Sequence, residues 1–457
     1  MSNQKHLGDA PIGKLLLQYS IPAIIGMVVN ALYNIVDRMF IGNIPDIGSL
    51  AITGVGITMP IMTIVLAFGM LIGIGTTANI SLNLGKGNRT TAEKLLGNAF
   101  TLSIIVGLAI AITGTIFANP ILNLFGASEN TLFYAKEYIG IILLGCTFNI
   151  LSFALNSTVR ADGNPTMSSI TMVIGCGANI ILDYLFIFVL NLGVKGAALA
   201  TIISQAITFF IILYYYTSGN SNLKLKIENF KLKKHLVTMT FAIGIAPFAT
   251  QIANSLVQVI ANNALKTYGS DLAIGAMTVI SSLNIIFMMP IFGLNQGSQP
   301  IIGYNYGAEK YKRVKQAVKS ATIVATIIVS IGWIITQAAP HLLISIFNRD
   351  EQLVGIASTG MRIFLLMLPV VGAQVISSNY FQSIGKAKIS MFLSLLRQVI
   401  LLIPCLIILP KIFGLTGVWL AGAVSDGLSS LITLIIFFMS VRKLKDKEEI
   451  VAKEAII

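Results

Sequence analysis

The chain has 457 residues, of which 55% are hydrophobic and 11% are charged, and its mean hydropathy is +0.84. Globular proteins carry about 25% charged residues, so this composition excludes a soluble enzyme, a disordered chain and a nucleic-acid-binding module. A polytopic membrane protein remains. Its formal net charge of +13 is then a matter of membrane topology rather than of nucleic-acid binding.

Twelve apolar runs are long enough to cross a bilayer, because a ~30 Å hydrocarbon core requires roughly 20 helical residues. The runs are continuous, whereas the strands of a membrane β-barrel alternate in hydropathy. The sequence therefore predicts an all-α polytopic membrane protein with twelve transmembrane helices. The predicted spans are 14–42, 50–84, 95–118, 131–159, 166–190, 195–217, 237–266, 271–305, 316–339, 353–382, 388–410 and 415–442.

The basic residues predict the orientation of these spans. With the N-terminus inside, most of the 31 Lys and Arg residues fall in cytoplasmic segments. This bias follows the positive-inside rule. We therefore expect a multi-pass protein of the cell (inner) membrane with both termini in the cytoplasm, the lipid bilayer as its surroundings and no nucleic-acid partner.

An internal repeat relates the two halves of the chain. A shift of 222 residues places Leu50-Ala51-Ile52 on Leu272-Ala273-Ile274 and Gly163 on Gly385. Each half holds six spans and inserts the same way up, so two pseudo-symmetric six-helix lobes should face each other across a central cleft. The expected organisation is an N-lobe over 1–216, a basic cytoplasmic linker over 217–236, a C-lobe over 237–442 and a charged cytoplasmic tail over 443–457.

Two carboxylates share a depth within the first half. At 1.5 Å per residue, Asp37, Asp183 and Thr201 lie about 8–11 Å below the outer boundary, and Asn179 shares the helix face of Asp183. These oxygen-bearing side chains suit a hard monovalent cation such as Na⁺, or a proton shared by the two carboxylates. The alternative is that each aspartate only makes hydrogen bonds between helices.

Two other residues stand out within the spans. Asp426 lies deeper in the membrane and its repeat mate is Gln205, so functional and structural interpretations of it stay equally open. Pro22 lies in the middle of the first span, where a proline frees a backbone carbonyl and permits a kink. A static bend is the alternative for Pro22.

Polar side chains at helical spacing on the first and seventh spans should line the cleft, where water tolerates them. Met and Phe residues of the eighth span would make this lining adaptable, or they are ordinary packing residues. The candidate substrate-cleft residues are Asn30, Tyr33, Asn34, Asn156, Gln251, Asn254, Gln258, Met288 and Met289.

Several motifs together carry a resemblance to a known family. They are Ile21-Pro22 through Tyr33-Asn34-Ile35-Val36-Asp37, the turn Arg160-Ala161-Asp162-Gly163-Asn164-Pro165, Asn179-x-x-x-Asp183, and Gly193-x-x-Gly196-Ala197-Ala198 before Thr201. With these residues in place, the chain resembles the multidrug and toxic compound extrusion (MATE) family, and the pattern is most similar to its DinF-like and MepA-like prokaryotic branches.

The resemblance implies export of cationic or amphiphilic small molecules in exchange for inward H⁺ or Na⁺, with no other cofactor. It also implies that Asp37, Asn179, Asp183 and Thr201 form an N-lobe cation site with a backbone oxygen near Ala197. The residue matching Pro22 is where the first helix bends when that site is protonated. Here the seventh and tenth spans carry no acid, unlike those of some members, which argues against a second cation site in the C-lobe.

Two other classes of function compete with an antiporter. A lipid-linked oligosaccharide flippase of the same superfamily would need a cationic cavity for pyrophosphate, and the cleft residues named above are neutral or acidic. A membrane enzyme would need a catalytic constellation, and the spans hold no HExxH motif or Ser/His/Asp set. We therefore expect a transporter that is not an enzyme and that acts as a monomer.

Overall fold

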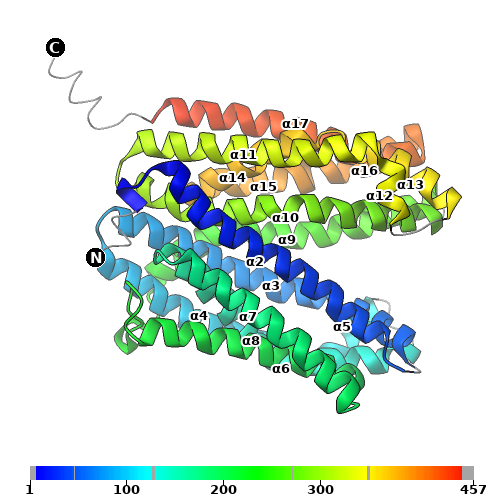
Figure 1. Ribbon diagram of the computed structural model, residues 1–457, viewed down its shortest axis with the longest axis horizontal. Coiled ribbons are helices and arrows are strands. Elements are labelled where there is room, and N and C mark those ends of the chain that lie inside the picture. Colours follow the sequence, from blue (N-terminus) through cyan, green and yellow to red (C-terminus); the bar gives the residue numbers. More distant parts are fainter. Residues whose placement is uncertain (1–6, 46, 126–128, 270, 347–349, 445–457) are drawn as a thin grey trace. The chain divides into compact units, whose positions relative to one another are not determined.

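The computed structural model describes residues 7–45, 47–125, 129–269, 271–346 and 350–444, and these ranges contain helices and no strand (Figure 1). The helices are α2 (Ile12–Gly42), α3 (Gly48–Gly85), α4 (Arg89–Ile116), α5 (Ala118–Leu124), α6 (Glu129–Ala161), α7 (Pro165–Tyr184), η1 (Leu185–Val189), α8 (Gly193–Thr217), η2 (Ile227–Asn229), α9 (Lys234–Tyr268), α10 (Asp271–Gly307), α11 (Tyr311–Ala338), α12 (Pro340–Ser345), α13 (Glu351–Phe364), α14 (Leu368–Ser383), α15 (Ala387–Leu395), η3 (Leu396–Leu402), α16 (Ile403–Phe413) and α17 (Leu415–Arg442).

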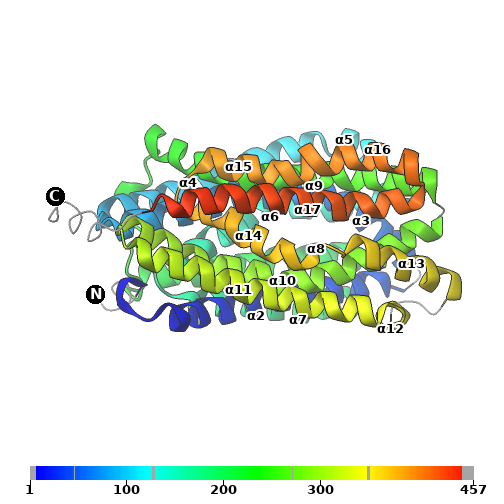
Figure 2. The ribbon, with the colours of Figure 1, turned by 90° about the horizontal axis from the view of Figure 1, so that it is seen from above.

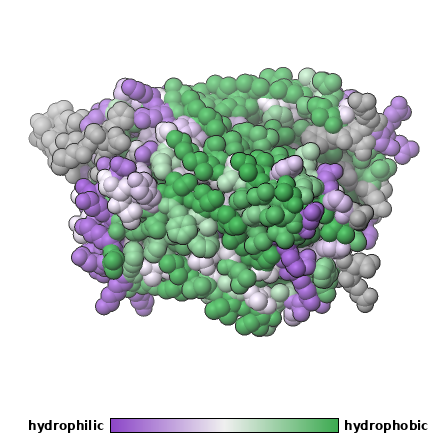
Figure 3. All heavy atoms as spheres, turned by 60° about the horizontal axis from the view of Figure 1, so that its bottom comes forward, coloured by the Kyte–Doolittle hydropathy of each residue, from purple (hydrophilic) through white to green (hydrophobic). Residues whose placement is uncertain are grey.

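These helices confirm the prediction of an all-α polytopic membrane protein. Within the described ranges, eleven helical segments are long and apolar enough to span a bilayer, and the pair α13 and α14, bent by 49°, makes a twelfth when counted as one broken span. Apolar side chains cover the middle of the face in Figure 3, with hydrophilic ones gathered toward its ends. Exposed residues such as Ile112 (61%) and Ile116 (67%) are typical of a lipid-facing surface.

Internal contacts divide the chain into two compact units. Among the described residues, the first unit contains 7–9 and Ile25–Phe248, and the second contains Ala10–Ile24 with the chain that follows Phe248. The chain crosses between the units three times. One crossing lies between Asp9 and Ala10, and the other two fall inside helices, in α2 close to Pro22 and in α9 close to Pro247. The predicted linker over 217–236 therefore lies within the first unit. The bend assigned to Pro22 stays a prediction, and α2 continues through this proline.

The first unit is built on α3, α4, α6 and α8, which run alongside one another (Figure 1). Glycine brings these helices close together. A Cβ on Gly107 of α4 would lie 2.6 Å from Cα of Thr147 on α6, and one on Gly73 of α3 would lie 2.9 Å from Cα of Ala154. Small residues at such crossings allow the backbones of membrane helices to pack directly.

In the second unit, α11 packs on α14 and α10, and α17 packs on α14 and α16. Figure 2 shows α15 and α16 following one another along one helical run, and α17 packs against its η3 and α16 parts. The apolar core at one end of this unit joins α9, α10, α16 and α17 through Leu265, Ala273, Leu406 and Ala421. Each unit therefore has its own helix packing and its own core.

Backbone geometry confirms the repeat. Gly163 and its repeat mate Gly385 have φ angles of +100° and +77°, and Gly193 and Gly414 have φ angles of +54° and +58°. Glycine populates this region at no steric cost, so the same turns recur at equivalent points of the two halves. The helices that follow Gly163 and Gly385 also each contain a π-helical turn, η1 in the first and η3 in the second.

Candidate cation site in the first unit

Helices α2, α7 and α8 carry the side chains predicted to bind a cation. Asp183 and Asn179 of α7 are fully buried, at 0% and 1% exposed, and Thr201 of α8 is 5% exposed. Asp37, near the C-terminal end of α2, is half-buried. The side chains of Asp37 and Asp183 lie close enough for each carboxylate to affect the charge of the other. The structure thus brings the two predicted carboxylates close together.

Local signals in the sequence explain how α7 presents its part of the site. The side chain of Asn164 accepts a hydrogen bond from the N–H of Met167 at 3.0 Å, and Pro165 occupies the first turn. Both are typical helix-start features. The helix then widens into the π-turn η1, two residues after Asp183. Such turns are frequent at functional sites because they redirect side chains within a helix.

The buried polar atoms of this cluster lack hydrogen-bond partners. In the described part of the chain, both carboxylate oxygens of Asp183, Oδ1 of Asp37 and both polar atoms of the Asn179 amide have no hydrogen-bond partner. Two ionised carboxylates can only accept hydrogen bonds, so Asp37 and Asp183 can bond to each other only when they share a proton. Unpaired charge is costly to bury, which makes this pair a strong candidate for a proton or a cation.

The atoms available as ligands limit which cation this site can bind. Across the described residues, no group of three or more His, Cys, Asp or Glu side chains could hold a metal ion. Two carboxylates and an amide supply hard oxygen ligands, which suit Na⁺ by charge and chemistry. The residues present therefore fit Na⁺ or H⁺, and Asp37, Asn179, Asp183 and Thr201 would hold it.

One residue near the site was missed by sequence reasoning. Tyr138 of α6 is 2% exposed, and its hydroxyl interacts with Thr201 and lies close to Asp37 and Asp183. The Thr201 hydroxyl donates to the carbonyl of Ala197 at 3.0 Å. The available signal was a polar-tipped aromatic inside the fourth span, but only packing of α6 against α8 places it at the cluster.

The predicted cleft residues lie on α2, α6, α9 and α10. Asn34 donates to the carbonyl of Asn30 at 2.7 Å, and Asn254 donates to the side chain of Gln251 at 3.2 Å. The side chain of Gln258 donates to that of Asn262 at 3.1 Å. Tyr33 and Met289 are half-buried, and Met288 is buried. A role in substrate binding stays a prediction for this set.

Asn156 has a distinct environment within the set. Its amide donates to the carbonyl of Ser168 at 2.8 Å and to the hydroxyl of Thr171 at 2.7 Å, and its oxygen accepts from Arg160 at 2.9 Å. Arg160 also donates to the Ser168 hydroxyl. This buried network joins α6 to α7, so Asn156 holds together the two helices on either side of the Asp162 turn.

Asp426, whose role the sequence left open, forms an ion pair in the second unit. Nε of Arg397 in η3 donates to Oδ1 of Asp426 in α17 at 2.5 Å. The two side chains are 30% and 13% exposed. Unlike the carboxylates of Asp37 and Asp183, the carboxylate of Asp426 is neutralised by an arginine from a neighbouring helical segment.

Comparison with known proteins identifies the family of this chain. The MatE family model matches residues 22–185 and 247–407, one stretch in each half. The chain belongs to the MatE family. It is therefore a multi-pass membrane transporter and not an enzyme, as the motifs of its first half predicted.

Relatives and solved structures agree with this assignment. The MATE chain is 29% identical to "Multidrug export protein MepA" of Staphylococcus haemolyticus over 98% of both chains, and 28% identical to the protein of that name in Staphylococcus aureus strain MRSA252 over 94% of both. The solved structure of the "MATE multidrug transporter DinF-BH" is 37% identical, with a TM-score of 0.90 over 97% of this chain and 100% of that one. "Crystal structure of MATE in the bent conformation", at 22% identity and a TM-score of 0.91 over 97% and 98% of the chains, shares the fold.

Proposed function

We propose that this MATE transporter is a secondary active multidrug efflux antiporter. It exports cationic or amphiphilic compounds in exchange for inward H⁺ or Na⁺, and the exchange is coupled through Asp37 and Asp183. The names of the MepA proteins, which are multidrug exporters, and of the multidrug transporter DinF-BH support multidrug export. The observation that supports the coupling is the proximity of two carboxylates whose buried oxygens have no hydrogen-bond donors.

The coupling follows from the charge of this pair. A proton or Na⁺ that enters the cluster neutralises one carboxylate and supplies the missing donor or ligand contacts. Coupling requires the cation to bind the two transport states with different affinities. Asp37 is on α2, and α2 contributes residues to both units. Neutralising the pair can therefore change how stably α2 packs within each unit.

The flippase alternative gains no support from the second unit. A pyrophosphate-linked lipid would require unpaired basic side chains within the membrane. Arg397 is an arginine in the middle of a span, and Asp426 already neutralises it. An antiporter of cationic and amphiphilic compounds accounts better for the acidic pair in the first unit.

Transport by purified protein in liposomes tests the proposal. We expect an imposed proton gradient or an imposed Na⁺ gradient to drive ethidium transport by the wild-type protein. Asp37→Asn and Asp183→Asn should each lower the gradient-driven rate by roughly tenfold or more, because an amide neither binds a proton near neutral pH nor contributes charge to a Na⁺ site. The rates are measured under the two gradients separately.

Glu351→Gln is the matched control, since it also removes one carboxylate, at an exposed position at the start of α13. It should keep the wild-type rate. If neither gradient drives wild-type transport, antiport itself is wrong. If a gradient drives transport and both aspartate variants keep the full rate, antiport stands and the site assignment is wrong.

A further inference from the structure

The segment that joins the two halves is bound to the first unit rather than free. We call residues 218–233 the strap. Its first anchor is Asp162, fully buried in the turn between α6 and α7. One carboxylate oxygen accepts from the N–H of Leu223 at 2.6 Å, and the other accepts from the N–H of Asn222 at 2.9 Å and the hydroxyl of Tyr215 at 2.6 Å.

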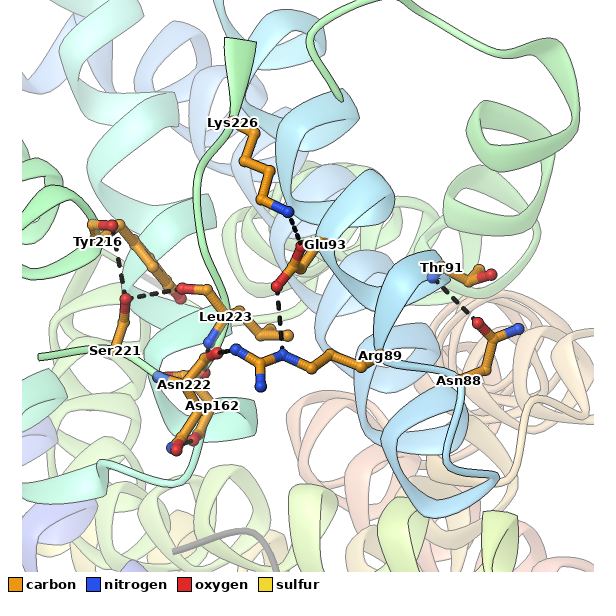
Figure 4. Close-up of polar contacts among 10 residues, drawn as sticks. All are labelled: Asn88, Arg89, Thr91, Glu93, Asp162, Tyr216, Ser221, Asn222, Leu223 and Lys226. Atoms are coloured by element: carbon orange, nitrogen blue, oxygen red, sulfur yellow. Dashed lines mark hydrogen bonds and ion pairs between the residues drawn. The ribbon is translucent and has the colours of Figure 1, made fainter. Parts of the chain in front are cut away.

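Glu93 of α4 is the second anchor (Figure 4). It is 7% exposed, and its two oxygens accept from Arg89 and Lys226, each at 3.2 Å. Arg89 also donates to the carbonyl of Asn222. The beginning and middle of the strap are thus held to α4 by charged groups that are themselves paired.

The third anchor lies further along α4. Asn98 donates to two strap carbonyls, those of Asn229 and Lys231, at 3.0 and 3.2 Å. Thr101 donates to the carbonyl of Phe230 at 2.8 Å. A Cβ on Gly97 would lie 2.5 Å from the carbonyl oxygen of Asn229, so the strap backbone lies directly against α4 here.

This third anchor lies at the edge of the membrane. The charged residues of α4 precede Asn98, and the uncharged stretch Ala99–Ile116 is about 27 Å long as a helix. That length nearly fills a ~30 Å hydrocarbon core. The part of the strap around Phe230 is therefore level with the boundary between headgroups and acyl chains.

The outer surface of the strap exposes apolar and basic side chains and a single acid, Glu228. Ile227 is 83% exposed and Leu232 is 37% exposed. Lys224, Lys231 and Lys233 are exposed on the same segment. Exposed aliphatic side chains next to lysines at the membrane boundary are typical of elements that bind the interface of anionic bilayers.

We propose that the strap is a binding surface for anionic phospholipid headgroups. Lys224, Lys231 and Lys233 attract the phosphates, and Ile227 inserts at the boundary of the acyl chains. We assign anionic phospholipid as the partner because the positive charge of the three lysines complements the negative charge of its headgroup. The proposal is independent of the coupling mechanism, because it concerns binding to the bilayer and not transport.

Tryptophan quenching tests this contact directly. The reporter is Ile227→Trp in a protein whose two tryptophans, Trp333 and Trp419, are replaced by Phe. The full chain is reconstituted in phosphatidylcholine vesicles that contain phosphatidylglycerol, with bromine on the acyl chains of one lipid or the other. We expect brominated phosphatidylglycerol to quench several-fold more strongly at equal mole fraction, and high salt to reduce this preference.

Two lysine variants with the same change in charge complete the test. Lys224→Gln/Lys231→Gln/Lys233→Gln should abolish the preference for phosphatidylglycerol. Lys136→Gln/Lys266→Gln/Lys411→Gln, which removes three exposed lysines outside the strap, should keep it. Equal quenching by both lipids, or no quenching, would overturn the proposal, as would an equal loss of preference in both triple variants.

If the tryptophan-free background does not fold, native mass spectrometry of the wild-type protein and the two triple variants replaces the quenching assay. The number of phosphatidylglycerol molecules retained should fall in the strap variant alone. Retention that is unchanged in the strap variant would contradict the proposal. Both readouts report lipid binding, so either result leaves the antiport proposal to its own experiment.

Discussion

Aspartate has three different roles in this protein, and the neighbours of each carboxylate decide which. Asp183 is buried beside Asp37 and lacks donors among the described residues, Asp162 is buried with three donors, and Asp426 is bonded to Arg397. A buried carboxylate with enough donors stabilises a local structure, whereas one without them needs a proton or a cation. The role of an acid therefore depends on its contacts rather than on its depth alone.

Asp162 should make attachment of the strap depend on pH. Burial raises the pKa of Asp162 to about 6, against the opposing effect of its hydrogen bonds from Tyr215, Leu223 and Asn222. Release of the strap would admit water and return this pKa to its ordinary value of 3.8, so the bound strap holds the proton more tightly. Attachment should be strongest below pH 4 and lose about 3 kcal/mol as the pH rises through 6. Hydrogen exchange of the strap amides, corrected for intrinsic rates, measures this change.

Asp162→Asn is the variant that isolates the effect. The amide nitrogen of Asn cannot accept, so one backbone N–H of the strap loses its partner at a cost of about 1–3 kcal/mol. The variant should exchange faster than wild type at acidic pH and show no pH dependence of its own. A pH dependence that persists in this variant would rule out Asp162 as the titrating group.

At the scale of elements, an ion pair joins the π-turn η3 to α17. Removing one partner of a buried pair leaves an uncompensated charge, whereas removing both can be close to neutral. The corresponding turn of the first unit, η1, follows the donor-free Asp183 instead. The two repeats thus share a π-helical turn, but the carboxylate near that turn is paired with an arginine only in the second unit.

Arg397→Met should destabilise the second unit by roughly 3 kcal/mol or more, because Asp426 then loses its counter-ion at 13% exposure. Arg397→Met combined with Asp426→Leu should recover most of this loss. Apparent melting temperatures of the purified proteins in detergent compare the single and double variants. A single variant as stable as wild type would show that the pair contributes no net stability.

At the scale of the whole molecule, the distribution of basic residues predicts the orientation in the membrane. The strap and the segment after α17 are rich in lysine, and the positive-inside rule places both in the cytoplasm. The lysines of the strap would then meet the inner leaflet, whose anionic lipids they are proposed to bind.

Cysteine labelling of intact cells checks this orientation. In a Cys405→Ser background, Leu124→Cys at the end of α5 should react with a membrane-impermeant maleimide. Asn220→Cys in the strap should react only after the cells are permeabilised. Both positions are exposed, so accessibility to solvent does not separate them. The reverse labelling pattern would invert the topology and place the strap in the outer leaflet.

The number and type of the spans and the internal repeat can be predicted from the residues alone. Composition and long apolar runs leave helices as the structure for these spans, because backbone groups in lipid must be satisfied within each segment. The two carboxylates at one depth, Asp37 and Asp183, were also readable, since a 1.5 Å rise converts position into depth. The family motifs of the first half agreed with both.

Which polar side chains contact one another depends on how the helices pack. The tertiary structure brought Tyr138 to Thr201 and paired Arg397 with Asp426. It also bound the strap, which the sequence predicts to be a linker, to the α6–α7 turn through Asp162 and to α4 through Glu93. These contacts join residues that are far apart in sequence, and helical periodicity fixes only the face of a residue within its own helix. The neighbours across a helix crossing depend on packing, and small residues such as Gly97 and Gly107 set how close that packing is.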